Sequence, residues 1–186
     1  SGESHIGEIS LPLGSKPTAF GCDMPKKIER DSLKYVTFSY KNQSGVDIDG
    51  DVTYYIDNFN NKFSAKTNKE TLLKLDAAIL ASGEHRLLAV CDKDTLDRKF
   101  VIFSMSDTKP CVKTDDWFYQ TDKSFNNDGR PVCIQVGSSA DNVHIVYTVI
   151  AGNNVIENGV IDQSNASKTQ QFTYKPEYDT GLLVNY

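Results

Sequence analysis

Apolar residues alternate with polar ones along most of this 186-residue chain, and this two-residue period constrains its fold more than any other feature. Successive side chains of an extended strand point to opposite faces, so the alternation predicts strands with one buried face. Before residue 107 the pattern covers residues 36–40, 52–56, 88–90 and 100–105. After residue 107 it covers residues 132–136, 143–149, 155–156, 160–161, 172–174 and 182–184. We therefore expect short antiparallel strands joined by turns.

A polar stretch near the middle, Asp107-Thr108-Lys109-Pro110, interrupts this pattern. Proline cannot donate a hydrogen bond to a sheet, so the stretch is typical of a junction between domains. Strands spaced by about 8–12 residues on both sides, with little helix, are typical of β-sandwiches. The sequence therefore predicts an all-β chain of two tandem antiparallel β-sandwiches of the immunoglobulin- or fibronectin-like type, residues 1–107 and 108–186.

Several local features refine this prediction. In the run 70–81, Leu72, Leu75, Ile79 and Leu80 have helical spacing, although the run also fits a strand followed by a short turn. In the first half, Leu88 and Val90 continue the alternation, and in the second half the dipeptide Asn158-Gly159 predicts a tight turn. The final apolar run, 182–184, has no turn after it, so we expect the second sandwich to be truncated and the natural polypeptide to be longer.

Composition and charge exclude some partners. The balance of 20 basic against 25 acidic residues gives a net charge near −5, so no positive surplus is available to bind the phosphates of nucleic acid. The longest clear apolar run, 100–103, is far shorter than the ~20 residues that a membrane-spanning helix requires. We therefore expect neither a nucleic-acid partner nor a membrane span.

Motifs that would support catalysis or metal binding are incomplete. Asp47, Asp49 and Asp51 alternate as calcium ligands can, but the loop lacks the glycine and acid positions of an EF-hand, and a charged hairpin turn explains it. Asp92, Asp94 and Asp97 are interleaved with basic residues, which favours a solvated loop. His5, His85 and His144 have no metal-binding spacing, and no phosphate loop or nucleophile elbow occurs. We therefore expect no enzyme activity, no cofactor and no metal.

The densest aromatic cluster is Trp117-Phe118-Tyr119, which follows Asp115 and Asp116. Exposed aromatic rings beside carboxylates can stack on sugar rings, so Trp117 and Tyr119 are candidate glycan contacts. The competing interpretation is a strand that packs into the second core. Exposure of Trp117 discriminates between the two.

Four segments carry a resemblance to a known family. They are Ser82-Gly83-Glu84-His85-Arg86-Leu87, Pro110-Cys111-Val112, the succession from Val136-Gly137-Ser138-Ser139 to Val143-His144-Ile145-Val146-Tyr147, and Phe172-Thr173-Tyr174-Lys175-Pro176-Glu177-Tyr178. The first is similar to the S-G-x-Y-x-L strand start of macroglobulin-type sandwiches, with His85 in the aromatic position. Together they resemble consecutive macroglobulin-like domains of the large bacterial alpha-2-macroglobulin family, particularly its Bacteroidetes members, over most of the chain after about residue 30.

Members of that family trap proteases when a bait region is cleaved, and a C-x-E-Q thioester can couple to the protease. None of the cysteines, Cys22, Cys91, Cys111 and Cys133, begins such a motif. The resemblance therefore implies non-catalytic scaffold domains of a larger extracytoplasmic protein, in the periplasm or at the outer membrane or cell surface. Their partners would be neighbouring domains of the same polypeptide and, through the full-length protein, target proteases. The alternative is a glycan- or ligand-binding β-sandwich module of a bacterial surface protein.

Overall fold

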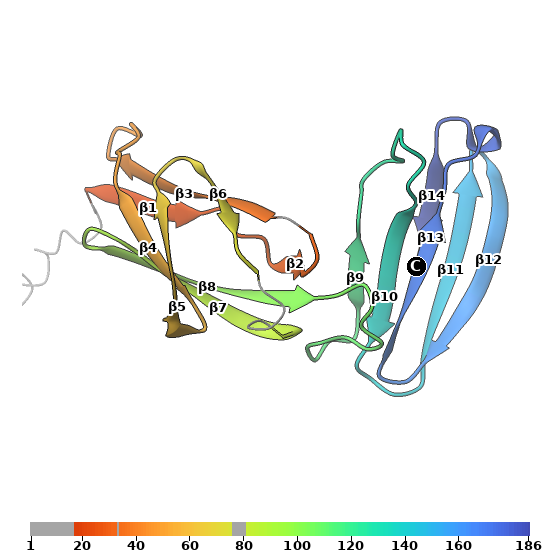
Figure 1. Cartoon of the computed structure of the whole chain (residues 1–186). Coiled ribbons are helices and arrows are strands. Elements are labelled where there is room, and N and C mark those ends of the chain that lie inside the picture. Colours follow the sequence, from red (N-terminus) through yellow and green to blue (C-terminus); the bar gives the residue numbers. More distant parts are fainter. Residues whose placement is uncertain (1–16, 33, 76–80) are drawn as a thin grey trace, which may run out of the picture. The chain divides into compact units, whose positions relative to one another are not determined.

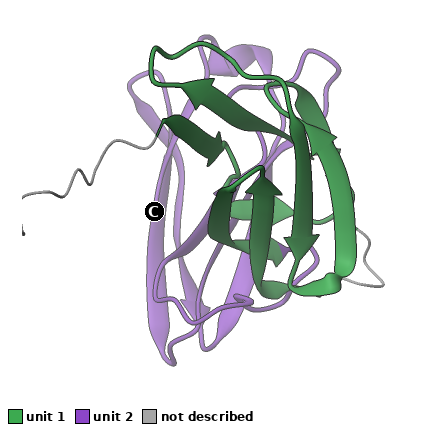
Figure 2. Ribbon diagram, turned by 90° about the vertical axis from the view of Figure 1, so that its left-hand side faces the viewer, with its two compact units in different colours: residues 1–102 green, residues 103–186 purple. Residues whose placement is uncertain are grey.

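The computed structural model describes residues 17–32, 34–75 and 81–186 and confirms the predicted all-β fold with antiparallel sheets (Figure 1). Within these residues the only helical element is a three-residue 3-10 helix, η2 (Pro176–Tyr178). No helix in the described part of the chain is long and apolar enough to cross a membrane. The chain divides into two compact units, residues 1–102 and 103–186, which are coloured separately in Figure 2.

The first unit consists of two sheets around one core. Its strands are β1 (Thr18–Cys22), β2 (Lys27–Glu29), β3 (Lys34–Asn42), β4 (Asp51–Ile56), β5 (Asn58–Lys66), β6 (Glu70–Leu73), β7 (Gly83–Cys91) and β8 (Asp94–Phe103). One sheet has the order β1-β3-β6, and the other has the order β2-β8-β7-β4-β5. Phe38 of the first sheet packs against Tyr54 of the second, with ring centroids 5.3 Å apart. The two sheets thus form a β-sandwich.

The alternation identifies the buried face of β3 and β4 and misplaces it in β7. Val36 and Tyr40 in β3 are buried as expected. In β7, Leu87 and Ala89 enter the core, whereas Val90 is exposed. This correction follows from an apolar run that continues from residue 87 to 91, in which no polar residue marks the outer face. Residues 70–73 form strand β6, while residues 76–80 of the alternative helix lie outside the described residues.

The second unit also consists of two sheets around a core. Its strands are β9 (Trp117–Gln120), β10 (Val132–Ser138), β11 (Val143–Ala151), β12 (Asn154–Gln163), β13 (Ala166–Phe172) and β14 (Leu182–Asn185). The sheets have the orders β13-β10-β9 and β12-β11-β14. Ile134 and Val136 of the first sheet share a buried cluster with Ile161 of the second. The predicted face of β10 is therefore correct.

One local prediction for this part of the chain requires correction. Asn158-Gly159 is not a turn, because it lies inside the ten-residue strand β12, with Gly159 opposite Tyr147. A Cβ atom on Gly159 would meet the Tyr147 ring at 2.8 Å, so glycine is needed here to let the ring cover the strand. The division between the units falls before the expected Asp107-Thr108 boundary, since the Phe103 ring packs on Trp117 with centroids 5.2 Å apart.

Candidate functional site

A cavity of about 210 Å³ lies between the two sheets of the second unit. Its apolar lining comes from both sheets: Val132 and Ile134 of β10, Phe172 of β13, and Leu182 and Val184 of β14. An engineered apolar cavity of about 150 Å³ is enough to bind benzene, so this cavity has room for one ring or one branched aliphatic group.

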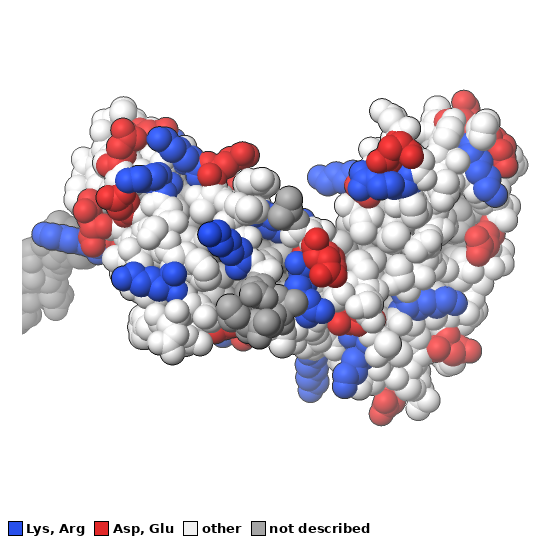
Figure 3. Space-filling view, in the orientation of Figure 1, with Lys and Arg blue, Asp and Glu red and all other residues white. Residues whose placement is uncertain are grey.

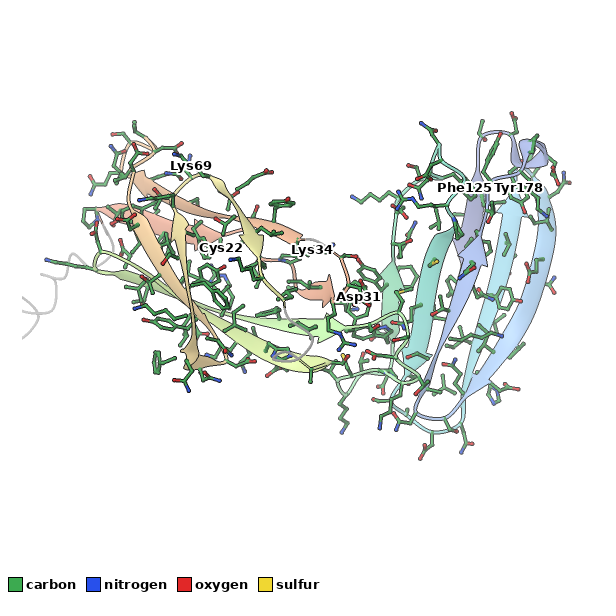
Figure 4. The ribbon with its side chains drawn as sticks, viewed as in Figure 1. Cys22, Asp31, Lys34, Lys69, Phe125 and Tyr178 are labelled. Carbon is green, nitrogen blue, oxygen red and sulfur yellow. The ribbon has the colours of Figure 1, made fainter. Side chains whose placement is uncertain are left out.

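The rim of the cavity is polar and aromatic. Asp122, Lys123 and Ser124 of the loop after β9 contribute to the lining together with Phe125. The Phe125 ring lies 6.2 Å from the ring of Tyr178, and Figure 4 shows both at the same end of the unit. An apolar interior with a few polar groups at the mouth is the usual composition of a ligand pocket.

Hydrogen bonds hold the rim loop against β10. The Thr121 backbone N–H donates to the Cys133 carbonyl, and the Cys133 N–H donates to Thr121 Oγ1, each at 2.9 Å. Gln120 Nε2 donates to the Asp122 carbonyl at 2.6 Å. Burial, with the nearby Asp122 carboxylate, raises the pKa of the Cys133 thiol. The thiol therefore stays protonated at neutral pH and is a poor nucleophile.

The two candidate glycan contacts do not line this cavity. Trp117 is only 3% exposed, and its Nε1 donates to Gln135 Oε1 at 2.9 Å. Tyr119 packs edge-on against Phe103, with centroids 4.5 Å apart. The exposed tryptophan that the glycan hypothesis requires is absent at this position. Trp117 and Tyr119 instead lie on the face of β9 that is covered by the segment beginning at Phe103, the last residue of β8.

Gln135 connects Trp117 to that segment, and we predict that Gln135→Leu destabilises the second unit. Gln135 is buried, and its Nε2 donates to the Ser104 carbonyl at 3.3 Å. Leucine would remove the acceptor that Gln135 offers to the buried Trp117 N–H, and the loss of a buried hydrogen-bond partner costs about 1–3 kcal/mol. Urea unfolding followed by Trp117 fluorescence measures the loss. The exposed Gln171→Leu is the control, and equal stability of the two variants would contradict this role.

Three of the acidic residues singled out in the sequence pair with basic neighbours, and Asp94 and Asp97 lie in strand β8 and not in the expected loop. Lys41 Nζ lies 3.1 Å from Asp47 Oδ1, and Lys66 pairs with Asp51. On the face in Figure 3, acidic and basic side chains are interspersed. Arg86 forms a two-pronged ion pair with Asp97, and this guanidinium lowers the pKa of the carboxyl. Among the described residues no group of three acidic, histidine or cysteine side chains is arranged to hold a metal ion.

The described histidines are held by backbone and carboxylate oxygens. His85 Nδ1 lies 2.5 Å from Asp57 Oδ2, and its Nε2 lies 2.5 Å from the Ala81 carbonyl oxygen. Both ring nitrogens are thus directed at oxygen atoms of a carboxylate and of the backbone, and not at a serine or cysteine side chain. His144 pairs with Asp162 across β11 and β12 in an exposed position. His5 lies outside the described residues.

We predict that ionisation of Tyr186 lowers the stability of the folded chain at high pH. Its Oη donates to Gln170 Oε1 at 2.7 Å, and burial raises its pKa from 10.0 to about 12. The folded chain thus holds this proton more tightly than the unfolded chain, so the contribution is complete below pH 10 and is lost as the pH rises toward 12. The free energy of unfolding of the Tyr186→Phe variant should fall less between pH 10 and pH 12. Urea unfolding at stepped pH measures this difference. Parallel curves for the two proteins would contradict the assignment.

No protein-family model matches the chain, and no curated protein matches it. The cavity was not predicted from the sequence, because its walls combine β10, β13, β14 and the loop after β9. The sequence does contain a signal for a site in this region. Phe125, Tyr174 and Tyr178 are aromatic residues in segments rich in Asn, Asp, Gly and Pro. Aromatic side chains in such loops indicate a local cluster or a binding surface.

Proposed function

We propose that this chain is a non-catalytic scaffold module: two macroglobulin-like β-sandwiches of a larger alpha-2-macroglobulin-like protease-trapping protein of the bacterial periplasm or cell surface. The observation that carries the proposal is the repetition of one strand order. The sheet β1-β3-β6 of the first unit corresponds to β9-β10-β13 of the second. The run β5-β4-β7 corresponds in the same way to β12-β11-β14. Tandem copies of one sandwich are typical of extended multidomain proteins.

A shared irregularity supports this correspondence. The register of the β4–β5 hairpin shifts between Tyr55 and Ile56, and the register of the β11–β12 hairpin shifts between Val149 and Ile150. In both hairpins the shift lies close to the turn. Bulges are local features that bend a strand at a fixed place, so their recurrence in matching strands agrees with a repeated unit.

An exposed apolar face in the second unit fits a module that contacts neighbouring domains. Val146 and Val160 lie opposite each other in β11 and β12, and they are 64% and 58% exposed. Leu183 of β14, opposite Ile150, is 57% exposed. We call these four residues the outer face. Thr148 lies between the two pairs along β11, and exposed apolar side chains gathered on one face of a sheet commonly mark interaction sites.

The test compares this chain with the natural polypeptide that contains it. We expect Val160→Cys in the outer face to react with maleimide about tenfold more slowly in the natural protein, since a covered residue reacts only after local opening. Asn153→Cys, at the exposed β11–β12 turn, is the control and should react equally in both. Peptide mass mapping separates these sites from the native cysteines. Equal rates at Val160→Cys, or a natural protein of only 20.7 kDa, would refute the scaffold function.

A second candidate function, ligand binding, is favoured by the rimmed cavity. Phe125 offers a ring at the mouth, and Lys175 Nζ lies 6.0 Å from the centre of the Tyr178 ring. The ligand would carry a small apolar group with polar substituents, as a sugar or an aromatic metabolite does. Titration of the chain with such ligands, with Phe125→Ala as the control, distinguishes this candidate from the scaffold function. Saturable binding that Phe125→Ala abolishes would favour it.

A further inference from the structure

The two units match strand by strand except at one end of one sheet, where the first unit has β8 and then β2 beyond β7. In the first unit, β7 pairs with β4 on one side and with β8 on the other. In the second unit, the corresponding strand β14 pairs with β11 on one side, and the strand order ends there. Within residues 103–186, all of which the structure describes, no strand corresponds to β8.

In the first unit, β8 extends the sheet beyond β7 and contributes to the core. It is a ten-residue strand paired antiparallel with β7 from Gly83↔Ile102 to Cys91↔Asp94, across a turn of two residues, Asp92-Lys93. Its side chains Leu96, Phe100 and Ile102 belong to the buried core. The strand beyond β7 therefore contributes apolar side chains that seal one side of the sandwich.

The cavity of the second unit lies beside the position that such a strand would take. Leu182 and Val184 of β14 line it from one sheet. Gln120 of β9, the strand that ends the other sheet, lines it as well. The space between these two end strands is thus incompletely filled by the unit's own side chains.

The end strands of the second unit also differ in charge. β12 carries Glu157 and Asp162, and β13 carries Lys168. Charged residues on an outer strand discourage pairing with another chain. β14, with the sequence Leu-Leu-Val-Asn, has no charged residue. β9, with the sequence Trp-Phe-Tyr-Gln, has none either, so the two end strands beside the cavity lack the protection that β12 and β13 have.

We propose that the free edge of β14 receives a further strand, a segment of the same longer polypeptide that runs antiparallel to β14 and places an apolar side chain in the cavity. This proposal rests on the proposed function, because the scaffold module is there part of a longer chain. The recognition is strand addition, in which main-chain hydrogen bonds supply affinity and a pocket for alternate side chains supplies specificity. The added strand would occupy beside β14 the position that β8 occupies beside β7.

The test extends the full chain after Tyr186 with an Asn-Gly turn and a copy of the β8 sequence. Asn-Gly is the dipeptide that tight antiparallel hairpins favour. We expect the thermal midpoint of the second unit, followed by Trp117 fluorescence, to rise by about 5 °C or more. Hydrogen exchange at the backbone amides of residues 182–185 should slow by about tenfold or more.

The matched control is the same extension with the copies of Leu96, Phe100 and Ile102 replaced by serine, and it should produce neither change. Equal effects of both extensions, or no protection of β14 by the first, would overturn the proposal. So would a dimer of the unextended chain with β14 amides already protected, since a second copy would then occupy the edge. The maleimide test of the outer face is independent of β14, so the failure of one proposal is distinguishable from that of the other.

Discussion

Phe38→Ala should lower the free energy of unfolding of the first unit by about 3–5 kcal/mol, the range for truncation of a buried phenylalanine. The Phe38 side chain is fully buried, and it packs between Phe20, at 6.3 Å, and Tyr54, at 5.3 Å between ring centroids. Its removal would leave a cavity between the two sheets. Far-UV circular dichroism during urea unfolding should show an early transition that the unaltered chain lacks.

The only tryptophan, Trp117, lies in the second unit and provides an internal reference. Its fluorescence transition should stay at the denaturant concentration of the unaltered chain, since each unit has a core of its own. Phe59→Ala is the matched control, because Phe59 in β5 is 72% exposed and its loss should change stability little. A fluorescence transition that moves with the dichroism signal in Phe38→Ala would contradict two separate cores.

Gly137→Ala should destabilise the second unit by about 3 kcal/mol, at the upper end of the usual cost of overpacking. A Cβ atom at this position in β10 would lie 2.5 Å from the Ala166 carbonyl oxygen and 2.9 Å from the Ser167 Cα. Both are backbone atoms of the adjacent strand β13, so the strands must separate to admit the methyl group. Urea unfolding followed by Trp117 fluorescence measures the effect.

Gly21→Ala tests whether backbone contact is the cause. Its added Cβ would meet Ser39 Oγ at 3.0 Å, and this side chain can rotate away. We expect the free energy of unfolding to fall by less than about 1 kcal/mol, an amount that surface substitutions rarely exceed. If Gly137→Ala were tolerated as well as Gly21→Ala, the close approach of β10 and β13 would not constrain the sheet.

The sequence predicts faces correctly where polar and apolar residues alternate without interruption. Residues 36–40 of β3 do so, and Val36 and Tyr40 are buried accordingly. In β7 the residues on both faces are apolar, so the periodic signal vanishes and the buried face depends on which neighbours the strand meets. Asn158-Gly159 shows a different limit, because its turn preference is overridden by nine paired positions along β11 and β12.

The candidate site was less predictable than the fold for a physical reason. The chemistry of Trp117 favours a glycan contact, but its burial depends on Phe103 and Gln135, which lie far away in sequence. The cavity likewise depends on which strands end the two sheets, and alternation along single strands carries no information about strand order. The position of Phe125 at the cavity can be recognised only when the positions of β9 and β14 are known.

The buried thiol of Cys91 allows local opening of the first unit to be measured by alkylation. Cys91 in β7 is 1% exposed, and burial raises its pKa, so little thiolate forms and reagents cannot reach it in the closed state. Alkylation must therefore wait for the strand to detach. When reclosing is faster than alkylation, the rate of mass gain at Cys91 measures the population of the open form directly. This gives the opening equilibrium of β7 in native buffer, without denaturant and without any substitution in the chain.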